Sequence, residues 1–171
     1  MSEFLSQLAQ FNQADGQTNS YNTLQELVSS LQSNQALQAS ALVGRRVLVL
    51  SNSFTLNAKS NVSIAIDIPQ GFNYLNAFVY TESGELVKTI YHQHPVSGLV
   101  QFIWDGCDEE RVRMPAARYK VEVCGMKNGE KVFLKTMILA NVNSVSLGER
   151  LKLNVSGVGP VLLEQVRQIT V

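Results

Sequence analysis

The chain has 171 residues, of which 14 are basic, 14 are acidic and 45% are hydrophobic. This length can form one domain or two small ones with a buried core, and the zero net charge argues against a role in binding nucleic acid. We expect no membrane insertion, because no apolar run approaches the roughly 18 residues of a membrane span. The N-terminus also lacks a basic segment followed by an apolar core, so a Sec-type signal peptide is not expected.

The first 42 residues are predicted to be helical and differ in composition from the rest. They contain no Lys, Arg or His, and eight glutamines fall within the first 38 residues. Apolar residues at helical spacing predict a short amphipathic helix over residues 4–11, ended by Asp15-Gly16. A second helix is predicted to begin at Thr23, which opens a capping box, and to continue to about Leu42.

The second predicted helix carries a thin, partly polar seam with a seven-residue repeat. Its candidate self-association residues are Leu24, Leu27, Leu31, Asn34 and Gln38. A helix with so narrow an apolar stripe is not very stable alone. It is therefore expected to pack against copies of itself or a partner, or to fold back on the rest of the chain, and both alternatives stay open.

From Gly44 onward, short strands alternate with turns. Residues 62–68 alternate strictly between apolar and polar or small side chains, which is typical of a half-buried strand. Asn128-Gly129 lies between two apolar runs and predicts a hairpin turn. Turns recur about every ten residues, which favours an all-β sandwich or barrel over a parallel sheet.

Two segments around residues 98–123 are predicted to supply the core. Alternation places one set of apolar side chains on a single face of each strand, and the structural core candidates are Phe102, Trp104, Tyr119, Val121 and Val123. Asp105-Gly106 supplies the turn after the first strand. Tyr74, Phe78 and Tyr80 also share a face that we expect in the core, so no exposed aromatic platform for a ligand is expected.

No catalytic, cofactor or metal site is expected. His92 and His94 bracket one residue, but spacing indicates no third ligand, so they are interpreted as solvated loop histidines. The acidic residues 108–110 lie beside two arginines and are interpreted as solvated and mutually paired with them. Cys107 and Cys124 are expected to be free thiols, since nothing in their spacing demands a bridge.

Several short motifs together resemble the flagellar hook-capping family. They are Trp104-Asp105-Gly106, Pro115 and Tyr119, the run from Gln7 to Phe11, and the C-terminal Leu163 with residues 166–169. The family usually has Gly just before the Tyr, whereas this chain has Arg118, so a locally different turn is expected there. The family also has more chain upstream, so this chain is expected to be a fragment or a member that starts at an internal Met.

The resemblance implies a mainly β fold: a fibronectin type III-like β-sandwich inserted into a small tudor-like β-barrel and preceded by an α-helical segment. The implied boundaries are a helical segment at 1–42 for oligomerisation or anchoring, a barrel from 43–62 and 139–171, and a sandwich at 63–138.

The implied function is that of a non-enzymatic scaffold, or cap, required for bacterial flagellar hook assembly. Such a cap guides the polymerisation of hook protein at the distal end of the rod and hook, where it resides transiently. The implied partners are hook protein subunits, the flagellar export apparatus and further copies of the chain, and export needs no cleaved signal peptide. The alternative is an extracellular β-sandwich binding module, either an adhesin or a carbohydrate binder, which an exposed aromatic platform would favour.

Overall fold

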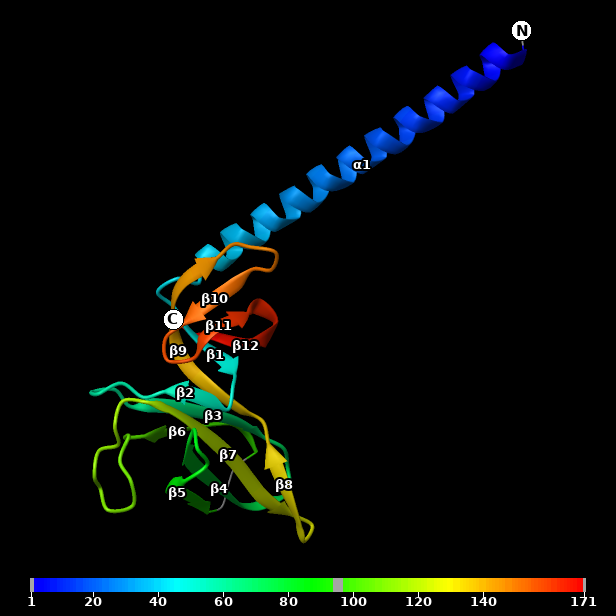
Figure 1. Ribbon diagram of the computed structural model, residues 1–171. Coiled ribbons are helices and arrows are strands. Elements are labelled where there is room, and N and C mark those ends of the chain that lie inside the picture. Colours follow the sequence, from blue (N-terminus) through cyan, green and yellow to red (C-terminus); the bar gives the residue numbers. More distant parts are fainter. Residues whose placement is uncertain (1, 94–96, 171) are drawn as a thin grey trace. The chain divides into compact units, whose positions relative to one another are not determined.

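The computed structural model describes residues 2–93 and 97–170 (Figure 1). The chain divides into two compact units, Met1–Ala41 and Leu42–Val171. The first is helical and the second is built from strands, as the change in composition near Gly44 predicts.

The N-terminal unit is one continuous helix, α1 (Ser2–Ser40), so the prediction of two helices is wrong. Asp15-Gly16 lies inside the helix because one interior glycine costs only about 1 kcal/mol relative to alanine, which neighbouring good helix formers can offset. The prediction that Thr23 opens a capping box is also wrong, because Thr23 lies inside the helix and no helix begins there. The Thr23 hydroxyl Oγ1 instead donates to the Asn19 carbonyl at 2.8 Å, as a hydroxyl inside a helix does.

The larger of two antiparallel sheets has seven strands. They are β1 (Arg46–Leu50), β3 (Val62–Ile68), β6 (Gly98–Trp104), β9 (Thr136–Ser146), β10 (Lys152–Val155), β11 (Gly159–Leu162) and β12 (Val166–Thr170), with the short helix η1 (Leu163–Gln165) before β12. The order is β11-β10-β9-β1-β12, and β3 pairs with both β9 and β6. The long strand β9 organises this sheet, because β1 lies along one of its sides while β3 and then β10 share the other.

The second sheet has five strands. They are β2 (Ser53–Thr55), β4 (Phe72–Thr81), β5 (Leu86–Gln93), β7 (Arg118–Lys127) and β8 (Glu130–Leu134). The order is β2-β7-β4-β5, with β8 also paired to β7. The turn from β7 to β8 is Asn128-Gly129, with φ of 52° and 79°, which confirms the predicted hairpin.

The predicted fold class is confirmed: the chain is mainly β with one N-terminal helix, and its strands form two sheets that are not closed. The boundaries within the β unit stay a prediction. One strand pairing crosses these predicted boundaries. Strand β2 comes from the stretch assigned to the barrel, but it pairs with β7, which lies in the stretch assigned to the sandwich.

The core lies between the inner faces of the two sheets. Trp104, Tyr119, Val121 and Val123 are each at most 1% exposed, whereas Phe102 is half-buried because β6 is an edge strand with a neighbour on one side. The other buried residues of these faces include Val62, Ile64, Ile66 and Ile68 from β3 and Leu75, Ala77 and Val79 from β4.

The prediction that Tyr74, Phe78 and Tyr80 lie in the core is wrong. The alternate residues of β4 are buried instead, while Tyr74 is 41% exposed and the other two are half-buried. Both faces of β4 are rich in apolar residues, so alternation alone cannot select the inner one. The inner face is also closely packed, since a Cβ added at Gly125 would lie 2.6 Å from Leu75.

Candidate contact surfaces

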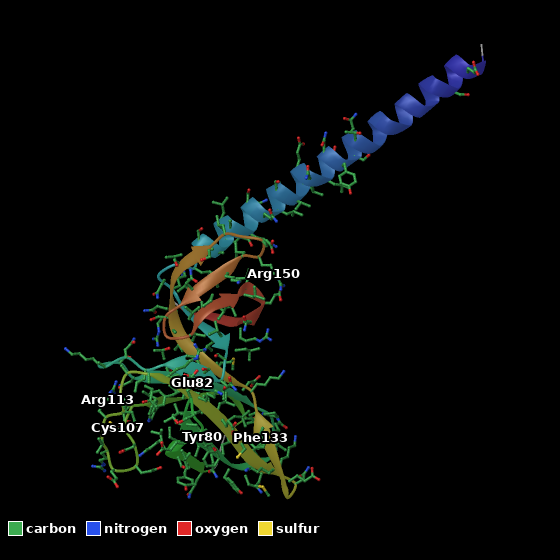
Figure 2. All side chains as sticks on the ribbon, in the orientation of Figure 1. Tyr80, Glu82, Cys107, Arg113, Phe133 and Arg150 are labelled. Atoms are coloured by element: carbon green, nitrogen blue, oxygen red, sulfur yellow. The ribbon has the colours of Figure 1, made fainter. Side chains whose placement is uncertain are left out.

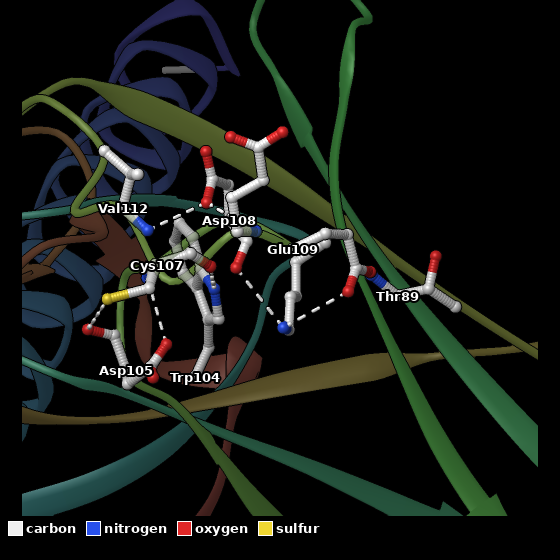
Figure 3. A network of polar contacts seen from close by, with 9 residues as sticks. Thr89, Trp104, Asp105, Cys107, Asp108, Glu109 and Val112 are labelled. Atoms are coloured by element: carbon white, nitrogen blue, oxygen red, sulfur yellow. Dashed lines mark hydrogen bonds and ion pairs between the residues drawn. The ribbon is translucent and has the colours of Figure 1, made fainter.

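The Trp-Asp-Gly turn and the following tyrosine form one packed corner of the β unit. The Trp104 ring meets the Tyr119 ring edge-on at 5.3 Å and the Phe54 ring at 5.8 Å between centroids. The indole Nε1 donates to the Cys107 carbonyl at 2.9 Å, and the Tyr119 hydroxyl donates to the Pro115 carbonyl at 2.8 Å. Burial also raises the pKa of the Tyr119 hydroxyl. The motif residues are therefore tied together by ring packing and hydrogen bonds, of which Figure 3 shows the bond from the Trp104 indole to the Cys107 carbonyl.

Gly106 and Arg113 complete this corner. Gly106 has a φ of 78°, and a Cβ there would lie 2.6 Å from Arg113 Nη1, so both backbone conformation and space require glycine. The Arg113 guanidinium donates to the carbonyls of Asp105, Asn57 and Ser60, the last two at 2.8 and 2.6 Å. Sequence reasoning missed this role, because Arg113 lies as much as 56 positions along the chain from the residues that it binds.

Arg118, where the resemblance led us to expect a locally different turn, lies at the start of β7. It is not among the described residues with a positive φ, so its backbone has no left-handed strain. Its Nε donates to the Ser53 hydroxyl at 2.9 Å. Arg118 is accommodated as an ordinary strand residue.

The acidic loop after β6 organises its own turn and reaches β5. Asp108 Oδ1 accepts hydrogen bonds from the backbone amides of Glu110 and Val112, both at 2.9 Å. Glu109 accepts from the Thr89 amide at 2.7 Å and from Lys88 Nζ at 3.3 Å (Figure 3). The Thr89 amide and then Lys88 lower the pKa of the Glu109 carboxyl. The expected pairing with arginines is wrong, since the partners of Asp108 and Glu109 among the described residues are a lysine and backbone amides.

The described residues offer no metal centre. No group of three or more His, Cys, Asp and Glu side chains within 2–93 and 97–170 could hold a metal ion. His92 is exposed at the end of β5, and His94 lies outside the described residues. Both cysteines are free, with Cys107 half-buried and Cys124 buried. In the part of the chain that the structure describes, no helix has the length and apolarity to cross a membrane.

The self-association candidates lie along α1. Leu24 is 58% exposed, and Leu27 and Leu31 are each 56% exposed. Asn34 and Gln38 are also exposed. At 3.6 residues per turn, their spacings of three, four and seven keep these side chains on one side of the helix.

A second surface, here called the outer aromatic face, covers the five-stranded sheet on the side away from the core. It consists of Tyr74, Phe78, Tyr80, Tyr91 and Phe133, which register places on one face. Tyr91 and Phe133 are 72% and 61% exposed, and Figure 2 labels Tyr80 and Phe133 in this part of the β unit. The expectation that no aromatic surface is exposed is therefore wrong.

A cleft of about 620 Å³ lies beside this face. Its lining combines apolar side chains with three charged ones, Asp67, Lys135 and Arg167; the apolar residues are Leu48, Leu50, Leu99, Phe133, Leu134 and Met137. Such a mixed lining could receive an apolar side chain with a charged neighbour, and it adds to the surfaces available for protein contact.

The fold and these surfaces define a mainly β protein with a helical N-terminal arm, whose distinctive exposed features are apolar contact surfaces. Residues 34–167 match the family model of the FlgD Tudor-like domain, which is well over half of the chain. The chain therefore belongs to the FlgD family of flagellar hook-capping proteins, as the sequence motifs indicate.

Individual relatives agree with this assignment. The chain is 24% identical over 144 residues to the basal-body rod modification protein FlgD of Buchnera aphidicola from Acyrthosiphon pisum, covering 84% of this chain and 61% of that protein. It is 25% identical over 175 residues to the protein of that name from Escherichia coli K12, covering 98% and 76% respectively. The crystal structure of FlgD from Xanthomonas campestris matches with a TM-score of 0.73 and 30% identity over 80% of this chain and 99% of that one.

Proposed function

We propose that this protein is a scaffold that caps the growing flagellar hook and guides the polymerisation of hook protein at its distal end. The observation that carries the proposal is the likeness to Xanthomonas campestris FlgD, whose structure is described in terms of a hook capping essential for flagellar assembly. The match of residues 34–167 to the family's tudor-like domain supports it independently.

A non-enzymatic role is part of this proposal. The acidic groups of the most polar loop are engaged in structural contacts: Asp108 accepts from backbone amides, and Glu109 holds Thr89 and Lys88. The Arg113 guanidinium is likewise occupied by carbonyl oxygens. These contacts stabilise the loop and support a structural role for its charged groups.

Hook protein subunits, the flagellar export apparatus and further copies of the chain are the proposed partners. We assign the outer aromatic face to contact with hook protein, since aromatic side chains supply much of the energy of protein interfaces. We assign the exposed seam of α1 to self-association, because Leu24, Leu27 and Leu31 bury their apolar surface only when a partner covers it. The proposed place of action is the distal end of the rod and hook, reached by export without a cleaved signal peptide.

The alternative of an adhesin or carbohydrate-binding module is not favoured by the comparisons, which point to flagellar proteins. The outer aromatic face is the feature that would support it. Measurements of swarming and of glycan binding therefore distinguish the two functions: a hook cap is needed for swarming, whereas a carbohydrate-binding module binds glycans.

The deciding experiment deletes the gene in its own host and measures swarming and hook formation by electron microscopy. We expect loss of swarming and of hooks, with both restored by the intact gene on a plasmid. A Tyr91→Ser, Phe133→Ser variant should restore swarming poorly. The matched control replaces two exposed apolar residues outside that face, Val112→Ser with Leu147→Ser, and should restore it fully. Normal hooks in the deletion strain would refute the proposed function.

A further inference from the structure

Strand β6 is an exposed sheet edge without charge. It has seven residues, Gly98–Trp104, none of which is charged or proline. All seven pair with β3, and among the described residues only β3 hydrogen-bonds to its main chain. In an antiparallel edge strand, alternate residues turn their N–H and C=O groups away from the neighbour, so β6 presents a row of unpaired backbone groups.

The other edge strands carry features that discourage pairing. On β5, the Thr89 amide donates a hydrogen bond to the Glu109 carboxylate and is therefore not available to a further strand. Strand β8 carries Lys131, β11 contains Pro160, and β12 carries Arg167, while β2 has three residues. Charges, prolines, short length and capping are the usual ways in which proteins block edge-to-edge association. Strand β6 lacks all of them.

The sequence of β6 is complementary to itself in the antiparallel direction. If two copies pair about a two-fold axis at Gln101, Leu99 of one copy lies opposite Ile103 of the other on the outer face. Val100 lies opposite Phe102 on the inner face. These four apolar residues then meet apolar residues, while Gly98 lies opposite Trp104 and leaves room for its ring; apolar cross-strand pairs of this kind stabilise a sheet.

We propose that β6 pairs with β6 of a second copy of this chain about a two-fold axis at Gln101. Leu99 and Ile103, which are 45% and 65% exposed, become partly covered by each other, and the half-buried Val100 and Phe102 extend the core across the junction. The nearest charged strand residue is Asp67 of β3, which pairs with Leu99 of β6. Strand β6 therefore separates Asp67 from β6 of the second copy, and no like charges meet. This contact is separate from α1 and does not rest on the proposed function.

Cross-linking at defined positions tests the register. In the intact chain with Cys107→Ser and Cys124→Ala, Gln101→Cys places two thiols directly opposite each other, within reach of a short bismaleimide. We expect rapid dimer formation by this variant. Leu99→Cys alone should link slowly, because its own copy lies four residues away along the strand, whereas a mixture of Leu99→Cys with Ile103→Cys should link rapidly. Equal rates for Leu99→Cys alone and for the mixture would overturn the register.

A charge at the axis tests the energetics. The background is Leu24→Ser, Leu27→Ser, Leu31→Ser, which removes any contribution from α1, and the readout is sedimentation across a range of concentrations. Gln101→Lys places two like charges opposite each other and should weaken dimerisation by about fivefold. Gln101→Thr keeps an uncharged strand former and should leave it unchanged. Melting curves of both variants establish that the monomer is folded.

A background chain that stays monomeric at every concentration, together with no cross-linking at position 101, would overturn pairing with a second copy. So would equal dimerisation of the Lys and Thr variants. Either result would leave the edge of β6 available for a strand of a different protein.

Discussion

Replacing Trp104 by Ala should destabilise the β unit by about 3–5 kcal/mol, the usual cost of truncating a large buried aromatic. The side chain is 1% exposed and packs edge-on against both Tyr119 and Phe54. A buried aromatic of this size removes roughly 150–250 Å² from water, worth about 4–6 kcal/mol at about 25 cal/mol per Å², and part of that area remains in alanine. The free energy estimated from the buried area therefore agrees with the cost expected from mutational data.

The smaller change Trp104→Phe removes the indole donor and keeps an aromatic ring in the core. Phenylalanine keeps most of the ring but leaves the Cys107 carbonyl without the indole donor, which should cost about 1–3 kcal/mol. Denaturant unfolding followed in the strand region of the circular dichroism spectrum measures both variants. The control is Tyr91→Ala, an aromatic that is 72% exposed on the same unit, which should change stability by at most about 0.5 kcal/mol.

A cost below about 1 kcal/mol for Trp104→Ala would refute the reasoning, because a ring removed from a packed core cannot cost so little. Equal stability of Trp104→Phe and wild type would show instead that the bond to the Cys107 carbonyl contributes nothing measurable.

Three further predictions concern the helix, the division of the chain and the acidic loop. Limited proteolysis should cut within α1 and leave a resistant fragment that begins near Leu42, where the two units divide; initial cleavage inside the β unit would contradict this. Changing Leu24, Leu27 and Leu31 together to Ser should remove helix-driven self-association while leaving the β unit's melting unchanged, and sedimentation of the intact and triple-variant chains decides it. Because the folded-state pKa of Glu109 is lowered, its stabilising contribution is present above its unfolded pKa and is lost as pH falls through the folded value. The protection of the Thr89 amide from hydrogen exchange, measured relative to its intrinsic exchange rate at each pH, should therefore fall in acid, and Glu109→Gln should lose that pH dependence; identical protection profiles would exclude the carboxylate as the cause.

Sequence alone determined the features that depend on neighbouring residues. The alternation in β3 identifies its buried face, because side chains of a strand point to opposite sides in turn. Asn128-Gly129 determines the hairpin, since both residues tolerate the positive φ that its turn requires. The Trp-Asp-Gly turn is equally local, with Asp105 Oδ1 accepting from the Cys107 amide at 2.9 Å. These short motifs also indicated the family.

Features that depend on competition between local signals could not be predicted from the sequence. Gly16 is a weak stop, and the helix formers around it outweigh its cost, so α1 continues through it. Strand β4 is apolar on both faces, and only the packing of its sheet against the seven-stranded sheet selects Val79 for the core and leaves Tyr74 outside.

The tertiary structure alone decided the contacts between distant residues. Arg113 binds carbonyls more than 50 positions away, and Glu109 reaches Thr89 across 20 positions. The free edge of β6 is likewise a property of the sheet order, which no single strand encodes. Local periodicity reflects the pleat and the helical turn, whereas these contacts depend on which strands the folded chain brings side by side.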